Sequence, residues 1–283
     1  MVQTGACTKR SVSDHPCFYG SAKARWGRVH LPVAPHCNIQ CNFCNRLYDC
    51  ANESRPGVTR WIIEPGDALD YLNPLLRRRS DISVVGIAGP GDPLCEPERT
   101  LEAVRAVHSA YPDLLLCLST NGLNASDYVD DLADAGVTHV TVTVNAVDPG
   151  IGQQIYSWVR MKNVVYRGIE AARILLARQR EAITRLKARD FIVKINSVIV
   201  PGVNDRHIEA IAEEVVNLGA DVMNCIPMVP VLDTPFENLK EPNEHEMNRI
   251  RDFASLHIPQ MYHCQRCRAD AAGLLCYDEN IDS

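Results

Sequence analysis

Short apolar runs alternate with longer amphipathic segments along the chain from residue 28 onward. The apolar runs predict buried strands, and the segments between them, with apolar residues at helical spacing, predict helices. The expected strands are residues 28–34, 81–88, 114–119, 138–144, 191–200 and 221–226, and the expected helices are residues 65–79, 97–110, 126–135, 163–188, 205–218 and 243–256. This alternation is typical of a parallel sheet whose strands are joined by right-handed crossover helices.

Six strand–helix units are too few to close an eight-unit barrel. We therefore expect an α/β fold, a partial (β/α)6 barrel that is open on one side and spans residues 28–258. Residues 1–27 and 259–283 lie outside the repeat and form irregular, cysteine-bearing N- and C-terminal extensions. In this architecture the loops at the carboxyl ends of the strands form the functional site.

The 283-residue chain has an ordinary globular composition, with 46% hydrophobic and 23% charged residues. Lys and Arg number 29 against 35 Asp and Glu, and the formal net charge of -6 lacks the basic excess of a nucleic-acid binder. No apolar run approaches the length of a membrane span, and residues 1–15 lack the apolar stretch of a secretory signal. We therefore expect a cytoplasmic protein that binds neither nucleic acid nor membranes.

Cysteine is unusually frequent, with 12 residues, of which six lie in the first 50 positions and three in the last 20. A chain of this length can bury a sufficient core without disulfides, and the cytoplasm is reducing. Clustered thiols in that setting indicate metal or redox chemistry more than disulfides.

Cys37, Cys41 and Cys44 follow the first expected strand with the spacing C-x3-C-x2-C. Three thiolates this close can hold three corners of a [4Fe–4S] cluster and leave the fourth iron open to a substrate or cofactor. The alternative is zinc, but structural zinc sites usually take two ligand pairs separated by about 12 or more residues. The spacing therefore favours iron–sulfur chemistry.

With Phe43 before its third cysteine, this loop resembles the signature of the radical S-adenosylmethionine (SAM) superfamily. The resemblance implies that the open iron binds the amine and carboxylate of SAM, and that an electron from the cluster cleaves SAM to a 5′-deoxyadenosyl radical. It also implies SAM contacts from a Gly-rich segment after the second strand and from polar groups at later strand ends. The residues at these positions are Gly89, Gly91 and Asp92 in the Gly-rich segment, and Ser119, Asn121, Asn145, Asn196 and Val198 beyond it. Many of these residue types are also ordinary turn formers.

Longer segments narrow the resemblance to the radical SAM maturases that build the precursor of the nitrogenase cofactor. They include residues 15–18, 33–35, 45–46, 48–57, 86–94, 145–149, 201–205, 224–228 and 264–271, so the likeness runs from residue 15 to residue 275. It implies that two [4Fe–4S] clusters, K1 and K2, are fused with insertion of a SAM-derived carbide and a sulfur to give an [8Fe–9S–C] product. One SAM methylates a K2 sulfide, and the radical from a second SAM abstracts hydrogen from that methyl group. We expect the single-domain form, without the C-terminal carrier-like domain of some of these maturases.

The resemblance also divides nine cysteines among three clusters. It assigns Cys37, Cys41 and Cys44 to the SAM-cleaving cluster, Cys17, Cys50, Cys117 and the imidazole of His30 to K1, and Cys7, Cys264 and Cys267 to K2. His15 is a rival nitrogen ligand, and His30 taken alone reads as a packed side chain. Cys95, Cys225 and Cys276 remain and are interpreted as small core residues.

Glu53 and Arg55 follow Cys50, and we expect catalytic roles for both. The Glu carboxylate could orient SAM or relay a proton, and the Arg guanidinium could offset the negative charge of the clusters. The alternative is a solvated ion pair worth under about 1 kcal/mol. The expected partners are SAM, an external electron donor, a cluster donor and the nitrogenase cofactor scaffold or carrier proteins, in an anaerobic or oxygen-protected cytoplasm.

Two other functions stay open. A different radical SAM enzyme with auxiliary clusters, such as an activase or an oxidoreductase, would share the three-cysteine loop without needing the other ligands together. A non-enzymatic iron–sulfur scaffold would hold fully ligated clusters whose spectrum SAM does not change. Iron content separates these functions, since three clusters hold about 12 iron atoms and the rival enzymes about four or eight.

Overall fold

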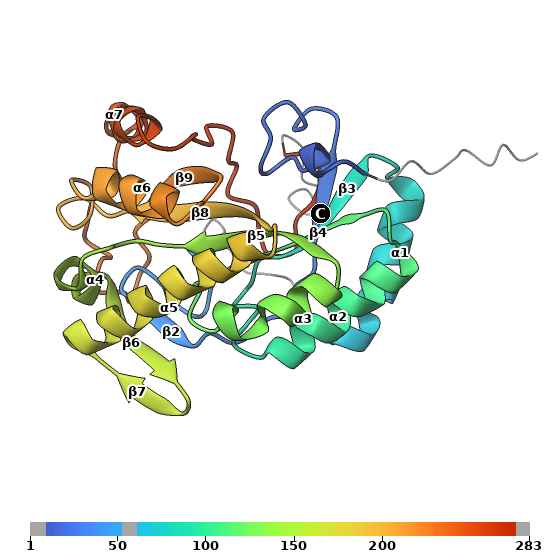
Figure 1. Cartoon of the computed structure of the whole chain (residues 1–283), viewed down its shortest axis with the longest axis horizontal. Coiled ribbons are helices and arrows are strands. Elements are labelled where there is room, and N and C mark those ends of the chain that lie inside the picture. Colours follow the sequence, from blue (N-terminus) through green and yellow to red (C-terminus); the bar gives the residue numbers. More distant parts are fainter. Residues whose placement is uncertain (1–9, 53–60, 276–283) are drawn as a thin grey trace, which may run out of the picture.

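The computed structural model describes residues 10–52 and 61–275 and is built on a seven-stranded sheet in the order β10-β1-β3-β4-β5-β8-β9 (Figure 1). Its strands are β1 Gly27–His30, β3 Ile82–Ile87, β4 Leu115–Thr120, β5 Val137–Thr143, β8 Ile192–Ile199, β9 Val222–Pro227 and β10 Ala272–Gly273. The six strands from β1 to β9 are mutually parallel, and β10 pairs antiparallel with β1. The predicted partial barrel of six parallel strands is therefore confirmed.

Seven α-helices are found in the described residues. They are α1 Ala68–Arg78, α2 Pro97–Ala110, α3 Val129–Asp134, α4 Pro149–Ile155, α5 Gly168–Ala188, α6 Ile208–Asn217 and α7 Glu244–Ser255, with short 3-10 turns at Val12–Asp14, Pro65–Asp67 and Ala125–Tyr128. Helices connect the successive parallel strands, as the alternating pattern predicts (Figure 1).

A second sheet of three strands, in the order β2-β6-β7, was not predicted. Its strands are β2 Ile39–Cys41, β6 Tyr156–Met161 and β7 Val164–Tyr166. Strands β2 and β7 have three residues each, and β2 lies inside the three-cysteine segment, whose spacing predicts metal chemistry but not a backbone conformation. This sheet matters for function because it fixes the cysteine loop to the rest of the protein.

Two predicted elements have wrong bounds. The first strand ends at His30 rather than residue 34, and Pro32 has no N–H group to continue a ladder. The long helix begins at Gly168 rather than residue 163, because β7 precedes it. Lys162 and Asn163 adopt left-handed conformations, with φ of 48° and 65°, in the tight turn that joins β6 to β7.

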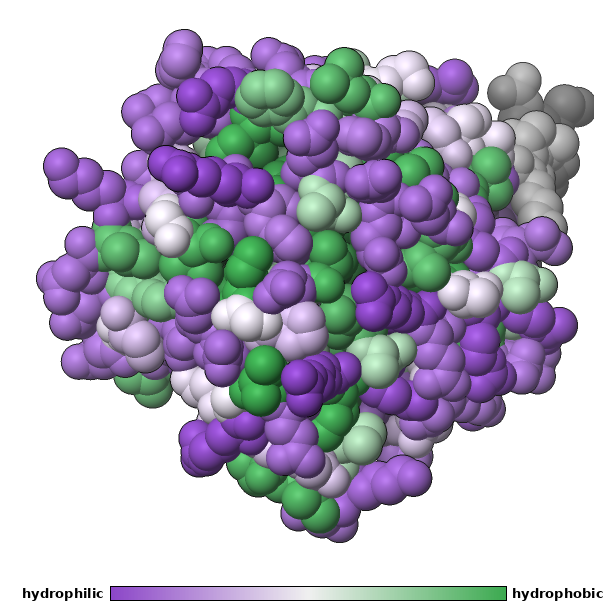
Figure 2. Space-filling view, turned by 60° about the vertical axis from the view of Figure 1, so that its left-hand side comes forward, coloured by the Kyte–Doolittle hydropathy of each residue, from purple (hydrophilic) through white to green (hydrophobic). Residues whose placement is uncertain are grey.

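The hydrophobic core has two parts. The larger part lies between the parallel sheet and its helices, and the smaller part surrounds the cysteine loop, β6 and the start of α5. On the face shown in Figure 2, hydrophobic side chains form small groups separated by hydrophilic ones. No helix in the described residues is long and apolar enough to cross a membrane.

Three rings anchor the N-terminal segment to the sheet. His15, Phe18 and His139 of β5 pack against one another with ring centroids 4.6–4.7 Å apart. Burial lowers the pKa of His139 to about 4, from an ordinary value of 6.5. The folded protein therefore holds this imidazole neutral at pH values where the unfolded chain protonates it.

We expect stability to fall as pH decreases from about 6.5 to about 4. The folded-state pKa of His139 is depressed, so the unfolded chain takes up a proton that the folded protein excludes. The loss for this one group approaches about 3 kcal/mol at the low end, and above pH 7 it vanishes. Urea unfolding of the cluster-free protein at pH 7.5 and 5.0 measures it. His139→Leu should reduce the pH dependence, and an unchanged dependence would contradict the assignment.

Candidate metal centre

The three-cysteine loop is held by the second sheet. Cys41 pairs with Tyr156 of β6, and the adjacent Asn42 backbone N–H donates to the Ile155 carbonyl oxygen at 2.7 Å. Phe43 is 1% exposed and packs in the smaller hydrophobic cluster. The packing of this ring in the hydrophobic cluster therefore holds the loop in position.

Amide groups point at the loop thiols. Asn121 Nδ2 lies 3.8 Å from Cys37 Sγ, and Asn52 Nδ2 lies 3.6 Å from Cys41 Sγ and 3.7 Å from Cys50 Sγ. Burial raises the pKa of Cys37 to about 12 and raises that of Cys41 well above its ordinary value. Without a bound metal these two thiols therefore keep their protons, and a metal must displace a proton from each thiol that it binds.

These thiols suit a cluster better than a single ion. In residues 10–52 and 61–275, no three side chains of the His, Cys, Asp or Glu type lie close enough to hold one metal ion. In a cubane each thiolate binds a different iron, so the sulfurs stand farther apart than around zinc. Amide donors beside the sulfurs are also typical of cluster ligands, whose potential they set. The residues present therefore fit a cluster bound by Cys37, Cys41 and Cys44.

The Gly-rich segment packs against the backbone that leads into the loop. A Cβ on Gly91 would lie 2.0 Å from the His36 carbonyl oxygen, so only glycine fits there. The Asp92 carboxylate accepts bonds from the backbone N–H groups of Leu94 (2.9 Å) and Asn121 (2.6 Å). Asp92 thus joins two loops that follow β3 and β4. Gly89, with φ of 134°, lies against Ala269 of the C-terminal tail.

The polar strand ends form a network around Asn52. Asn145 Nδ2 donates to Asn52 Oδ1 at 3.1 Å, and Asn196 Nδ2 donates to the Asn52 carbonyl oxygen at 3.2 Å. The Val198 backbone N–H donates to Asn145 Oδ1 at 2.8 Å. Asn52 was not predicted, although it lies in the motif around Cys50. The structure therefore brings Asn145, Asn196 and Val198 together beside Cys41.

A second group of predicted ligands lines a cavity on the inner side of the sheet. The cavity is lined by Cys17, His30, Cys117, Cys264 and Cys267, together with the rival His15 and the predicted SAM contacts Ser119 and Asn196. Residues from both ends of the chain and from the barrel strands thus converge at one place. Cys50 does not line this cavity but lies beside Cys41. Cys7, Glu53 and Arg55 lie outside the described residues.

Gly86 of β3 leaves space between two of these ligands. Its neighbours in register are His30 on β1 and Cys117 on β4. A Cβ at this position would lie 2.8 Å from Cys117 Sγ and 3.4 Å from His30 Cδ2. The missing side chain therefore lets the Cys117 thiol and the His30 ring approach each other across β3.

The two histidines differ in their tautomers. His30 Nδ1 lies 2.9 Å from the Arg268 carbonyl oxygen, which can only accept, so Nδ1 carries the proton and Nε2 the lone pair. His15 Nδ1 accepts from the Cys17 backbone N–H at 3.2 Å, so its proton is on Nε2. A ligating imidazole coordinates through one nitrogen and donates through the other. This geometry favours His30 over His15 as a ligand.

Three cations, two of them buried, surround these ligands, and the sequence patterns did not reveal them. Arg28 is 1% exposed and its Nη2 lies 2.9 Å from Cys267 Sγ. Arg266 Nη2 donates to the carbonyl oxygen of Ala51, next to Cys50, at 3.2 Å. Lys194 is 6% exposed and lines the cavity. They place positive charge where anionic clusters would bind.

The remaining cysteines differ in their burial. No disulfide joins two cysteines within the described residues. Cys225 is fully buried in the core, as predicted. Cys95 is only half-buried and lines a different pocket, so the interpretation as a core residue is wrong for it. Cys276 lies outside the described residues.

Comparison with known proteins defines the class. Residues 31–215 match the Radical SAM superfamily, and the chain belongs to that superfamily. Three solved structures share the fold at low sequence identity: Streptococcus suis SuiB bound to S-adenosylmethionine (TM-score 0.59, 14% identity, 84% of this chain and 50% of that one), anSMEcpe with bound AdoMet (0.58, 13%, 83% and 64%) and methylornithine synthase PylB (0.54, 15%, 90% and 77%).

Within the superfamily, the chain is similar to the FeMo cofactor biosynthesis protein NifB. It is 49% identical to NifB of Chlorobaculum tepidum over 265 residues, which are 94% of this chain and 62% of that protein. Identity is 44% with NifB of Klebsiella pneumoniae (95% and 58%) and 40% with NifB of Azotobacter vinelandii (95% and 54%). The chain thus spans 54–62% of the length of these curated relatives.

Proposed function

We propose that the chain is a radical SAM enzyme of nitrogenase cofactor biosynthesis. It fuses two [4Fe–4S] substrate clusters, K1 and K2, with insertion of a SAM-derived carbide and a sulfur, and yields the [8Fe–9S–C] precursor. The barrel of residues 28–258 performs the SAM chemistry, and residues 1–27 and 259–283 are cluster-binding extensions. The enzyme works in an anaerobic or oxygen-protected cytoplasm, and a cluster donor and a scaffold or carrier protein are its partners.

The observation that carries this proposal is the shared cavity. Cys17, Cys117 and Cys267 belong to three distant parts of the chain, yet they line one space together with the predicted SAM contacts Ser119 and Asn196. A single-cluster radical SAM enzyme has no use for this second thiol set. The similarity to NifB over about 95% of the chain supports the same substrate class.

Cys37, Cys41 and Cys44 would hold the resident cluster, which when bound supplies the electron that cleaves SAM. Asn121 and Asn52 donate to the sulfurs of this set and hold them in place. Gly91 lets the Gly-rich segment approach the loop closely, so that residues 89–92 can face the SAM amine. Glu53 and Arg55 are proposed to orient SAM and to balance charge.

The K1 substrate would be held by Cys17, Cys50, Cys117 and His30, and the K2 substrate by Cys7, Cys264 and Cys267. The tautomer of His30 supports its role, because its Nε2 lone pair can bind iron. The cavity measures about 50 Å³, which is room for a few water molecules. This space is too small for a cluster, so we propose that residues 261–268, which form no helix or strand, move outward to admit the substrates.

The test follows the methyl carbon of SAM with an isotopic label. The anaerobically reconstituted enzyme, loaded with about 12 iron atoms per chain, is incubated with SAM labelled with ¹³C in its methyl group and with a reductant. We expect the labelled carbon to leave the protein within the extracted cluster product, and one equivalent of 5′-deoxyadenosine to form. A cluster-replete sample that cleaves SAM but yields no labelled cluster would be a different radical SAM enzyme. A sample whose spectrum SAM does not change would be a scaffold.

A further inference from the structure

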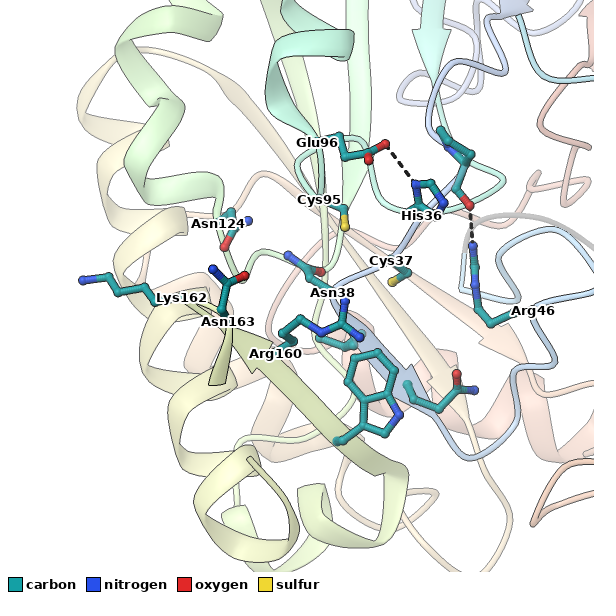
Figure 3. A pocket seen from close by; sticks show the side chains of 14 residues that line it. His36, Cys37, Asn38, Arg46, Cys95, Glu96, Asn124, Arg160, Lys162 and Asn163 are labelled. Atoms are coloured by element: carbon teal, nitrogen blue, oxygen red, sulfur yellow. Dashed lines mark hydrogen bonds and ion pairs between the residues drawn. The ribbon is translucent and has the colours of Figure 1, made fainter. Parts of the chain in front are cut away.

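A second, larger pocket of about 770 Å³ lies beside the three-cysteine loop (Figure 3). Its cationic lining residues are Arg46, Arg160 and Lys162. Its one acidic lining residue in the described chain is Glu96, whose carboxylate lies 3.1 Å from His36 Nδ1. The pocket is therefore locally basic, although the whole chain has a net charge of -6.

The backbone that carries two of the basic residues is bonded to the cysteine loop. The Arg160 backbone N–H donates to the Asn38 carbonyl oxygen at 2.8 Å, one residue after Cys37. Lys162 lies in the tight turn between β6 and β7, and both cationic side chains are exposed. The Cys37 side chain lines the same pocket, as Figure 3 shows. A thiol proposed to bind the resident cluster thus lies at a surface opening with cations at its rim.

We propose that this pocket is the docking surface for an acidic protein that carries single electrons. This inference rests on the proposed function, which requires an external electron donor. The carrier gives up one electron, the resident cluster gains it, and that electron is consumed when SAM is cleaved. The chain as a whole repels an acidic partner, so a local basic surface would focus its approach on the opening beside Cys37. Strand β7, which follows Lys162, adds apolar contact area through Val164 and Val165, whose side chains are 50% and 45% exposed.

The experiment compares two reductants on the reconstituted enzyme, with 5′-deoxyadenosine formation as the readout. Dithionite is a small donor that needs no docking surface, and reduced flavodoxin is the protein donor. In the double variant R160E/K162E we expect kcat/KM for flavodoxin to fall about 10- to 100-fold at low salt, with the dithionite rate within twofold of the wild type. In the wild type, added salt should raise the KM for flavodoxin, and this dependence should weaken in the variant.

The matched control is R77E/R78E, which reverses two exposed charges at the carboxyl end of α1. That helix end leads into the amino end of β3, whereas the cysteine loop follows the carboxyl end of the neighbouring parallel strand β1. Both reductants should act on this control as on the wild type. An unchanged flavodoxin rate in R160E/K162E, or an equal loss with dithionite, would overturn the docking assignment. A wild type that forms no 5′-deoxyadenosine with dithionite would instead refute the proposed radical SAM activity, and the docking surface with it.

Discussion

Replacing Gly86 by alanine is expected to lower the iron content of the reconstituted protein from about 12 to about 8 atoms per chain. The new Cβ would lie 2.8 Å from Cys117 Sγ, so the thiol must rotate away, and it would lie 3.4 Å from the His30 ring. Both side chains are proposed K1 ligands, and the added methyl group occupies the space between them. We expect formation of the cluster product to fall at least tenfold. Iron and sulfide analysis, together with product extraction, measures both effects.

The control for this prediction is Gly66→Ala. No heavy atom lies within 4 Å of a Cβ built at Gly66, and its backbone conformation suits any residue. This variant should keep the full iron content. The resident cluster supplies an internal control, because SAM cleavage driven by dithionite should persist in the Gly86 variant. Full iron content and normal product formation in Gly86→Ala would show that K1 does not lie between His30 and Cys117.

The parallel sheet and the three-cysteine loop could be predicted because each depends on a pattern of residues that are close in sequence. Alternating apolar runs and amphipathic segments define six strands and their helices, and three cysteines within eight residues predict a metal loop without knowledge of the fold. The hairpin of β6 and β7 was missed because a turn of two left-handed residues, Lys162 and Asn163, interrupts what resembles the start of a helix. Such a turn is decided by pairing with β2, which is more than 100 residues away in sequence.

The convergence of the two ends of the chain could not be derived from spacing. The choice between His15 and His30 depends on the Arg268 carbonyl oxygen, 238 residues from His30 in sequence. Asn52 is held by bonds from Asn145 and Asn196, which are distant from it in sequence. These contacts are set by tertiary packing, so the sequence can indicate the residue types but not which atoms meet. The resemblance supplied the ligand grouping that physical patterns alone left open.

Arg28→Met is expected to detach the C-terminal tail and to lower the free energy of unfolding by about 3 kcal/mol. The guanidinium is almost fully buried and donates to the carbonyl oxygens of Gly273 (2.7 Å) and Leu274 (3.1 Å). It also lies 2.9 Å from Cys267 Sγ. Methionine fills similar volume but leaves these acceptors without their donor. Urea unfolding measures the loss of stability.

The effect on the tail is measured by amide hydrogen exchange at residues 272–275 and by iron content. Exchange there should be at least tenfold faster in Arg28→Met, and the iron content should fall from about 12 to about 8 atoms per chain as K2 is lost. Arg28→Lys keeps the charge but cannot form the same fork of hydrogen bonds, so we expect an intermediate result. Arg77→Met, at an exposed position, should change stability by less than about 0.5 kcal/mol. If Arg28→Met keeps slow exchange and full iron content, the other contacts of the tail hold it, and the guanidinium has no part in placing Cys267.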